Sequence, residues 1–433
     1  MKSWREKYKE RLCTAEEAVS YIHPNDRVVV AHACGEPVIL TDAMTACAKE
    51  YGYENVEVIH MVAMGKAGYC APELREHFRH NGFFLGSSTR TAIEEGRGDF
   101  TPVYFSEIPE LFRTAIHVNV ALIQVSVPDD HGFCSFGISC DYTKPCVEAA
   151  DLCIAQINRN MPRVLGDNFI HISELDYIVE ADTPLIELQP PKISAVHEMI
   201  GENIAHLIKD GDCLQLGIGA IPDAVLSFLK DKKDLGIHSE MFSDGVVDLI
   251  EAGVITNRMK QIDRGQSVAT FLMGTQRLYD YVDDNPAVKL MPVDIVNDPR
   301  VICMNDNVVS INSCIEVDLM GQVCAESIGL KQISGVGGQV DFVRGANMSK
   351  GGRTIMAMTA TAANGSVSKI VPFLEKGAAV TTGRCDVDYI VTEFGIAKMH
   401  GFSLRERAAQ LINIAAPEFQ DELREEFRRR FLK

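Results

Sequence analysis

Short runs of β-branched residues alternate with amphipathic helical stretches along almost the whole chain. The first such unit opens at Thr14, with Glu17 three residues on as a capping box, and continues into a strand at Arg27–His32. Strands that alternate with helices form parallel sheets, because each helix carries the chain back to the start of the next strand. We therefore predict an α/β fold for this sequence.

Two segments about 185 residues apart share one pattern of an acidic start, a short strand, a glycine turn, a proline and a helix. They are Asp26–Val38 and Asp212–Asp223, and chance similarity is the alternative explanation. The segment Pro184–Lys192 is rich in proline, which resists both helix and central strand, so we take it as the linker. The sequence predicts two related open α/β domains with parallel-rich sheets, spanning residues 1–190 and 191–433.

The charge balance limits the partners of this protein. The 60 acidic and 42 basic residues give a formal net charge of −18, which repels phosphate backbones and anionic membranes. The longest apolar stretch, Val118–Val127, is half the length of a membrane-spanning helix. We expect neither nucleic acid nor membrane as a partner, and an anionic ligand would need a local array of N–H groups.

The thirteen cysteines are scattered and form no Cys-x-x-Cys motif, so we predict free thiols in a reducing compartment. The N-terminus is charged and lacks the apolar core of a signal peptide, so we expect a cytoplasmic protein. The one close histidine pair, His77 and His80, lacks a matching cluster, so we expect both to be solvated. No metal site is predicted.

A glycine turn follows the predicted strand Cys213–Leu216, and the helix after it is predicted from Pro222 to about Lys230. Backbone N–H groups at such a turn bind anions, although a purely structural turn is equally possible. A dinucleotide site, with Glu240 holding a ribose, would make the chain an NAD-dependent dehydrogenase. Pro222 occupies the position of the third glycine of that motif, so this interpretation remains the runner-up.

Glu240 lies just beyond the short predicted strand Leu235–Ile237. Open α/β sheets bind ligands at the carboxyl ends of their strands, where the glycine turn also ends. A carboxylate beside an array of N–H donors can act as a covalent nucleophile. The alternative is a solvated glutamate at a strand end.

A second glycine cluster, Ser334–Asp341, is too rich in glycine for a regular strand or helix. It either covers a ligand closely or forms a surface hairpin. The cluster is followed by no Walker lysine, and the chain has no Gly-x-Ser-x-Gly motif. A nucleoside triphosphatase and a serine hydrolase are therefore disfavoured.

Several separated motifs, all in order, resemble the acetyl-CoA hydrolase/transferase group of class I CoA-transferases. The resemblance runs from about residue 5 to the C-terminus, and the motifs that carry it are 127–136, 166–171, 217–222, 238–248, 334–342 and 391–397. It implies two α/β domains of similar fold with the active site between them. It also implies that Glu240 is the catalytic residue, which carries CoA as a glutamyl thioester.

The resemblance assigns further site residues one by one. The glycine turn would line CoA and the developing oxyanion through Gly217, Ile218, Gly219, Ala220 and Ile221. The CoA chain would be contacted by Asn297, Ile315, Gly337 and Gly338.

One departure concerns the CoA phosphates, because relatives carry a CoA-facing lysine in the stretch that corresponds to Ala357–Ser366, where this chain has none. The phosphate contact would then come from Lys350 or Arg353 instead, or be weaker. His32 would either face the acceptor acid or be structural.

The implied activity is transfer of CoA between acetyl-CoA or butyryl-CoA and a short-chain carboxylic acid, with 4-hydroxybutyrate as the leading acceptor. CoA would be both substrate and covalent intermediate, with no resident cofactor. Transfer from butyryl-CoA to acetate, hydrolysis of acyl-CoA and a non-enzymatic binding module remain alternatives. The family resemblance implies a homodimer or a higher homo-oligomer.

Overall fold

The computed structural model describes residues 3–432 and divides into two compact units. The first unit runs to Leu188 and includes Val268–Val296, and the second contains Gln189–Ser267 and the chain from Asn297 onward. Residues 181–194, which contain the predicted linker, form no helix or strand. The predicted division into residues 1–190 and 191–433 does not include this return of Val268–Val296 to the first unit. The domain boundary at residue 190 stays a prediction.

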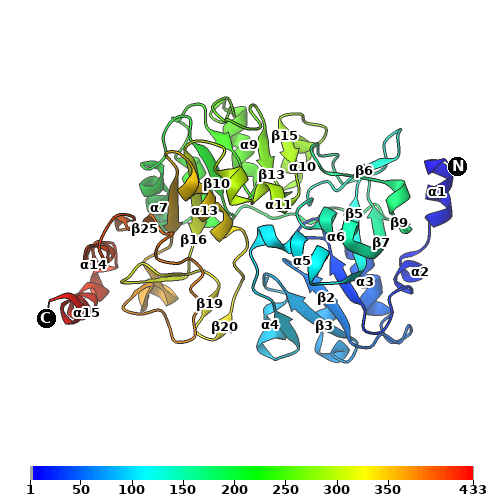
Figure 1. Cartoon of the computed structure of the whole chain (residues 1–433), viewed down its shortest axis with the longest axis horizontal. Coiled ribbons are helices and arrows are strands. Elements are labelled where there is room, and N and C mark those ends of the chain that lie inside the picture. The colour runs from blue at the N-terminus through cyan, green and yellow to red at the C-terminus, as the bar shows by residue number, and fades with distance from the viewer. Residues whose placement is uncertain (1–2, 433) are drawn as a thin grey trace. The chain divides into compact units, whose positions relative to one another are not determined.

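The first unit contains a seven-stranded sheet in the order β4-β3-β2-β1-β5-β7-β9 (Figure 1). Every pair of neighbouring strands is parallel. The strands are β1 (Arg27–Val30), β2 (Val56–His60), β3 (Phe78–Gly82), β4 (Gly98–Phe100), β5 (Val118–Val125), β7 (Ala150–Ile157) and β9 (Tyr177–Glu180). Short strands that belong to other sheets are β6 (Phe133–Ser135), β8 (Phe169–His171), β13 (Ser267–Ala269), β14 (Phe271–Leu272) and β15 (Val288–Leu290).

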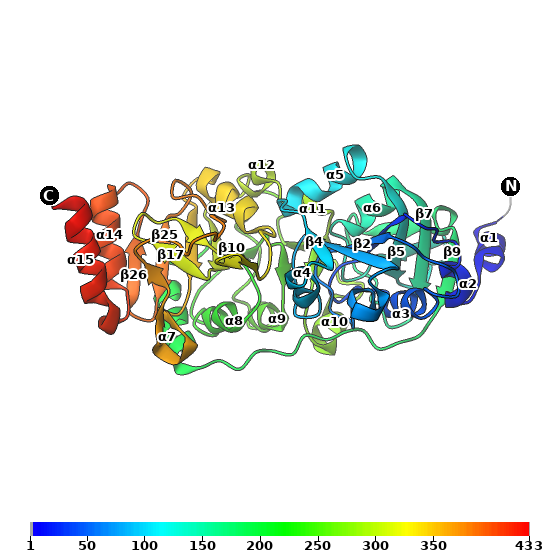
Figure 2. The same cartoon turned by 90° about the horizontal axis from the view of Figure 1, so that it is seen from below.

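Helices cover both faces of this sheet. They are α1 (Trp4–Arg11), α2 (Ala15–Val19), α3 (Val38–Ala46), α4 (Arg90–Glu94), α5 (Ile108–Thr114), α6 (Thr143–Ala149), α10 (Gln276–Val282) and α11 (Val293–Val296). Figure 2 shows α3 on one face, with α5 and α6 on the other. Leu40 and Met44 of α3 share a buried core with Val28 and Val30 of β1. Burial on both faces explains the nearly continuous apolar strands.

The second unit is built on the order β12-β10-β16-β21-β25-β26, with β11 beside β10. The four strands β10, β16, β21 and β25 are parallel, whereas β12 and β26 run antiparallel to their neighbours. The strands are β10 (Cys213–Leu216), β11 (Gly236–Ile237), β12 (Met241–Phe242), β16 (Val308–Ser313), β21 (Arg353–Ala357), β25 (Tyr389–Thr392) and β26 (Gly395–Lys398). The predicted α/β class with parallel-rich sheets is confirmed.

Figure 2 shows α7, α8 and α9 on one face of this sheet, and α12 and α13 on the other. The helices are α7 (Ala195–Ala205), α8 (Ala220–Ser227), α9 (Asp244–Glu251), α12 (Pro299–Ile302), α13 (Gln339–Met348), α14 (Leu404–Asn413) and α15 (Gln420–Phe431). The unit also contains a small three-stranded sheet of β17 (Glu316–Asp318), β18 (Val323–Cys324) and β24 (Ile370–Val371). Two short antiparallel pairs are formed by β19 (Ser327–Ile328) with β20 (Lys331–Gln332) and by β22 (Thr361–Ala362) with β23 (Val367–Ser368).

The helix signals read from the sequence have mixed outcomes. Thr14 caps α2 through a complete capping box, as the sequence predicts. The helix predicted from Pro222 instead begins at Ala220, with Gly219 as its N-cap. Pro222 is tolerated inside the first turn, because the first four N–H groups of a helix have no intrahelical acceptor.

The C-terminal helix α15 combines a charged, exposed surface with an apolar face. Leu423 of α15 is buried, and Phe427 and Phe431 pack against the same core as α14. These three residues recur every four positions, so they lie on one face of the helix. Lys433 lies outside the described residues.

All thirteen cysteines are free, and most of them are buried. The expectation that His80 is solvated is wrong, because the side chain lies inside the sheet and is 1% exposed. Its Nδ1 lies 3.0 Å from the carbonyl oxygen of Val58. The sequence showed only a histidine between two polar residues, and the burial comes from the alternation of side chains along β3.

We expect this burial to make the protein less stable in mild acid. Burial lowers the pKa of His80 from 6.5 to about 4 and also lowers the pKa of His60. Between these values the unfolded chain takes up protons that the folded chain does not, so the free energy of unfolding falls as the pH drops. The contribution of His80 should fall by about 2 kcal/mol between pH 7 and pH 5.

Urea unfolding at pH 7 and pH 5 measures this loss. His80→Gln should reduce the difference between the two pH values, because glutamine can still donate to Val58 and does not titrate. The exposed His23 provides the control, and His23→Gln should leave the difference unchanged. An unaltered pH dependence in His80→Gln would contradict the assignment.

Candidate active site

The parallel strands of the second unit end at one common edge. β10 ends at Leu216 and leads into Gly217, and its neighbour β16 ends at Ser313. The loop after β10 enters α8, whose N-cap is Gly219. This is the edge at which open α/β sheets bind ligands, because loops and helix N-termini converge there.

Glu240 lies on this edge, between the two-residue strands β11 and β12. Met241 of β12 pairs antiparallel with Leu216, the last residue of β10. The same register sets Glu240 opposite Gly217, at the start of the glycine loop. The predicted nucleophile and the predicted anion-binding loop therefore meet across one strand pair.

The carboxylate of Glu240 is held by two residues from distant parts of the chain. The Nδ2 of Asn297 donates to Oε2 of Glu240 at 3.0 Å. A carboxylate only accepts hydrogen bonds, which fixes the amide of Asn297 with its nitrogen towards Glu240. Gly338 approaches so closely that a Cβ built on it would lie 1.9 Å from Oε2 and 2.2 Å from the Nδ2 of Asn297.

Two glycines of the predicted site are required for different reasons. Gly337 has a φ of +55° and Gly219 a φ of +115°, backbone conformations that other residues rarely adopt. Gly338, by contrast, has an ordinary φ of −94° and serves as the N-cap of α13. Its small size lets the N-terminus of a ten-residue helix reach Glu240, where the helix dipole favours negative charge.

The glycine loop itself leaves room above β10. A Cβ on Gly217 or Gly219 would meet no atom within 4 Å. Ile218, between them, is 42% exposed, whereas Ile221 in the first turn of α8 is buried. Ala220 is the first residue of α8.

Ile315 lies on the same edge, just beyond the end of β16. It is half-buried, and its backbone N–H donates to the carbonyl oxygen of Cys324 at 2.8 Å. The structure thus brings Glu240, Asn297 and Gly338 into contact, places the glycine loop beside them and leaves Ile315 one strand further along.

A buried polar cluster beneath this edge was not predicted from the sequence. Oε1 of Gln215 accepts hydrogen bonds from Ser310 at 2.6 Å and from Asn312 at 3.2 Å, joining β10 to β16. Central strands of a parallel sheet are predicted from continuous runs of buried residues. Three polar side chains on β10 and β16 do not by themselves indicate that they contact one another. Only the pairing of Gln215 with Ser310 in the parallel register brings them together.

The two cations proposed for the CoA phosphates lie at the opposite edge of the sheet. Arg353 is the first residue of β21, and its guanidinium pairs with Asp212, which precedes β10. Lys350 lies 3.8 Å from Asp306, just before β16. Because β10, β16 and β21 are parallel, these residues mark the amino ends of the strands. Both residues therefore lie at the edge opposite Glu240, and the suggestion that one of them contacts the CoA phosphates stays a prediction.

The buried pair of Arg353 and Asp212 gives a prediction about stability. The side chain of Asp212 is 2% exposed and that of Arg353 is 13% exposed. Arg353→Met should lower the free energy of unfolding by about 3 kcal/mol or more, because it leaves a buried carboxylate unpaired. Urea denaturation measures this, and Lys350→Met, which removes an exposed charge, should change stability by less than about 1 kcal/mol.

The same pair of variants also tests the position of these cations. We expect the KM for an acyl-CoA to stay unchanged in both. A large rise in KM with intact stability would place the CoA phosphates at the amino ends of the strands after all.

His32 lies just beyond β1 in the first unit and is 1% exposed. Its Nδ1 lies 3.2 Å from Oδ2 of Asp141, which also accepts a hydrogen bond from Ser139 at 2.8 Å. The imidazole packs against the ring of Phe271, with 4.5 Å between ring centroids. This is a tightly packed and oriented histidine, and its Nε2 has no hydrogen-bond partner among residues 3–432.

Residues 3–432 contain no group of three or more His, Cys, Asp or Glu side chains that could hold a metal ion. Across the same residues, no helix combines the length and the apolar character that crossing a bilayer requires.

Comparison with known proteins places the chain in a family. Residues 1–188 match the acetyl-CoA hydrolase/transferase N-terminal domain, and residues 274–427 match the C-terminal domain of the same family. The chain is 60% identical over 429 residues to the 4-hydroxybutyrate coenzyme A transferase of Clostridium kluyveri, covering 99% of this chain and 100% of that protein. It is 40% identical to the butyryl-CoA:acetate CoA-transferase of Anaerostipes caccae, covering 97% and 96%.

A solved structure agrees with these matches. The 4-hydroxybutyrate CoA-transferase of Porphyromonas gingivalis superposes with a TM-score of 0.86 at 45% identity, covering 99% of this chain and all of that one. The chain therefore belongs to the acetyl-CoA hydrolase/transferase family. The prediction of a CoA-transferase of this family is confirmed, and the dinucleotide-site alternative loses its basis.

Proposed function

We propose that this protein transfers CoA from acetyl-CoA or butyryl-CoA to 4-hydroxybutyrate, with Glu240 as the covalent nucleophile. The observation that carries the proposal is the position of the Glu240 carboxylate. It is hydrogen-bonded to Asn297 and lies against the N-terminus of α13 at Gly338, and the strand pairing sets the backbone of Glu240 opposite Gly217. The identity of the acid is supported by the relative that is 60% identical to this chain.

Each half-reaction consists of two acyl-substitution steps. The Glu240 carboxylate attacks the acyl carbonyl carbon and breaks its bond to sulfur, which gives a mixed anhydride and free CoA thiolate. The thiolate then attacks the glutamyl carbonyl, forms the glutamyl-CoA thioester and releases the first acid as its carboxylate. The acceptor carboxylate reverses both steps, so that no water, proton or electron is consumed.

The residues around Glu240 have separate roles in this scheme. Backbone N–H groups of Gly217–Ile221 would stabilise the oxyanion that forms at each attack. Asn297 holds one carboxylate oxygen and orients the other. The Oδ1 of Asn297 is buried and has no hydrogen-bond partner within residues 3–432. We propose that it accepts a hydrogen bond from an amide N–H of the CoA chain, and that Gly337 and Ile315 also contact this chain.

Trapping the covalent intermediate tests this proposal. The protein is mixed with butyryl-CoA without an acceptor, treated with hydroxylamine or borohydride, and mapped by mass spectrometry. A label on the peptide that contains Glu240, discharged by added acetate, is the expected result. Steady release of CoA without an acceptor would instead indicate an acyl-CoA hydrolase, and absence of both label and turnover would refute the assignment of Glu240.

The acceptor is tested by comparing 4-hydroxybutyrate with butyrate, which differ by one hydroxyl group. A pocket that bonds this hydroxyl should favour 4-hydroxybutyrate by at least about tenfold in kcat/KM. Equal rates with the two acids, or faster transfer to acetate, would favour the butyryl-CoA:acetate alternative.

We further propose that the protein acts in the cytoplasm as a homodimer or a higher homo-oligomer, without a resident cofactor. The free, mostly buried cysteines suit a reducing compartment. The reaction above balances without redox chemistry, so CoA is the only carrier that it needs. Light scattering of the purified protein tests the oligomeric state, and a mass of 47.7 kDa would contradict it.

A further inference from the structure

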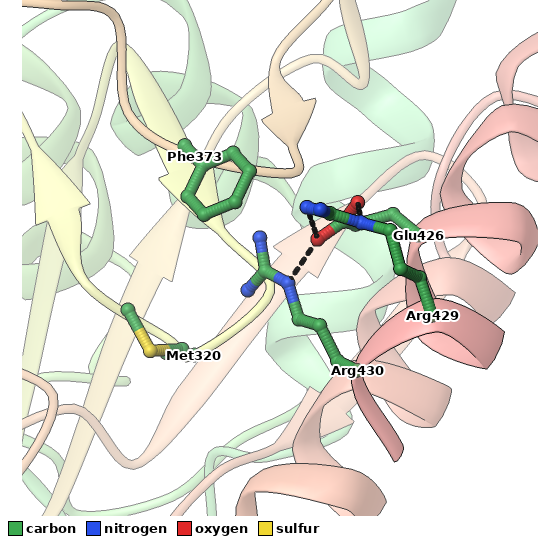
Figure 3. Close-up of a pocket in the computed structure, with 5 residues that line it drawn as sticks. All are labelled: Met320, Phe373, Glu426, Arg429 and Arg430. Carbon is green, nitrogen blue, oxygen red and sulfur yellow. Dashed lines mark hydrogen bonds and ion pairs between the residues drawn. The ribbon is translucent and has the colours of Figure 1, made fainter. Parts of the chain in front are cut away.

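A pocket of about 440 Å³ lies in the second unit, and none of the residues that line it belongs to the site around Glu240. It forms where the last turns of α15 meet the loops that follow β17 and β24 (Figure 3). Its walls are Met320, Phe373, Glu426, Arg429 and Arg430. Nothing in the scheme proposed for Glu240 uses these side chains.

The guanidinium of Arg430 is fixed at the centre of this pocket from three sides. Its Nε donates to Glu426, and its Nη2 donates to the carbonyl oxygen of Pro372 at 2.6 Å. The carbon of the guanidinium lies 4.0 Å from the centroid of the Phe373 ring, and the side chain is only 16% exposed. Figure 3 shows this packing. A cation held in this way loses little freedom when a ligand binds.

The pocket carries more positive than negative charge. Arg429 donates to Glu426 at 2.7 and 2.8 Å, so that one carboxylate serves two guanidinium groups. The hydrogen bond from Arg429, with that from Arg430, lowers the pKa of Glu426 to about 2 and keeps it ionised. Arg384, whose Nη1 lies 3.4 Å from the sulfur of Met320, adds a further positive charge at the rim. In a protein of net charge −18 this excess is local and favours an anion.

The remaining wall is apolar and flat. Phe373 is 56% exposed although one face of its ring is covered by Arg430. Met320 lies opposite, so an aromatic ring and a thioether face the same space (Figure 3). Exposed aromatic rings beside arginines are the surfaces on which nucleic acid bases stack.

We propose that this pocket binds a phosphorylated adenosine, with its base against Phe373 and Met320 and its phosphates on Arg429 and Arg430. Two sources share this chemistry: the adenosine phosphate head of a CoA thioester, and a free adenine nucleotide. The first rests on the proposed function. Met320 follows the end of β16 by seven residues, a reach of at most about 25 Å from the Glu240 edge.

Calorimetric titration of the full chain with adenosine 3′,5′-bisphosphate tests the site without turnover. We expect saturable binding that weakens about tenfold in Arg429→Met and about fivefold in Phe373→Ala. The matched control is Arg428→Met, which removes the same charge from the same helix outside the pocket and should change the affinity less than twofold. Arg429 and Phe373 are exposed, so both variants should fold.

The outcome that would overturn the proposal is absence of saturable binding at millimolar bisphosphate. Equal weakening in Arg428→Met and Arg429→Met would also overturn it, because that indicates only a general charge effect. So would inorganic phosphate that binds as tightly as the bisphosphate, since the base would then contribute nothing.

A second set of titrations distinguishes the two sources. If CoA displaces the bisphosphate, and Arg429→Met raises the KM for butyryl-CoA but not that for the acid, the pocket holds the head of the CoA substrate. If the bisphosphate still binds in the presence of saturating CoA and the KM is unchanged, the pocket is a separate nucleotide site. An inactive transferase that still binds bisphosphate would refute the proposed function and leave this site standing.

Discussion

Replacement of Glu240 by glutamine is expected to lower kcat/KM for CoA transfer by about 10⁴-fold or more, the scale on which removal of a catalytic nucleophile acts. An amide cannot attack the acyl carbonyl, although its oxygen can still accept the hydrogen bond that Asn297 donates to the carboxylate. The fold should therefore be unaffected. Initial rates with butyryl-CoA and 4-hydroxybutyrate, together with the trapping experiment, provide the measurement.

Glu251 offers the control for this variant, because it is an exposed glutamate at the end of α9. Glu251→Gln makes the same chemical change and should retain full activity. If Glu240→Gln kept activity within tenfold of the unaltered protein, Glu240 would be a positioning group and the nucleophile would have to be sought elsewhere.

Gly338→Ala is expected to reduce kcat by about 100-fold while the protein still folds. The new Cβ would lie 1.9 Å from Oε2 of Glu240, so the carboxylate would have to move by about 1 Å, and a displacement of that size costs about two orders of magnitude in rate. The backbone at Gly338 has a φ of −94°, which alanine adopts without strain. The pre-steady-state burst of butyrate from butyryl-CoA, without an acceptor, measures the slower attack.

The control is Gly383→Ala, at a position whose Cβ would approach no atom closer than 4.0 Å. It should leave both the rate and the thermal midpoint close to those of the unaltered protein. A change of less than threefold in Gly338→Ala would mean that Glu240 reacts from a different position than the one that Asn297 holds.

The parts of the fold that the sequence predicts are those with local causes. The capping box at Thr14 is complete within four residues, and α2 begins where the sequence places it. The two-residue strand β12 had no such signal, because two residues have no periodicity to read. It is nevertheless the pairing of Met241 with Leu216 that sets Glu240 beside the glycine loop.

The site was predictable in its residues but not in its contacts. The motif around Glu240 and the glycine pattern at 334–338 are visible in the sequence, and both lead to the right family. Asn297 meets Glu240 across 57 residues, and Arg353 meets Asp212 across 141. Such contacts depend on which strands become neighbours. The same reason explains why Arg353 looked available for phosphate, although the fold had already paired it at the other edge.

The return of Val268–Val296 to the first unit has a consequence for how the protein is made. Gly166 packs so closely on Leu290 that a side chain at position 166 would collide with the backbone of Leu290. The backbone N–H of Leu272 donates a hydrogen bond to the carbonyl oxygen of Ile138. A ribosome that has released only the first half of the chain has therefore produced an incomplete core. This unit can close only after residue 296 has emerged, when the whole first segment of the second unit, Gln189–Ser267, has already left the exit tunnel.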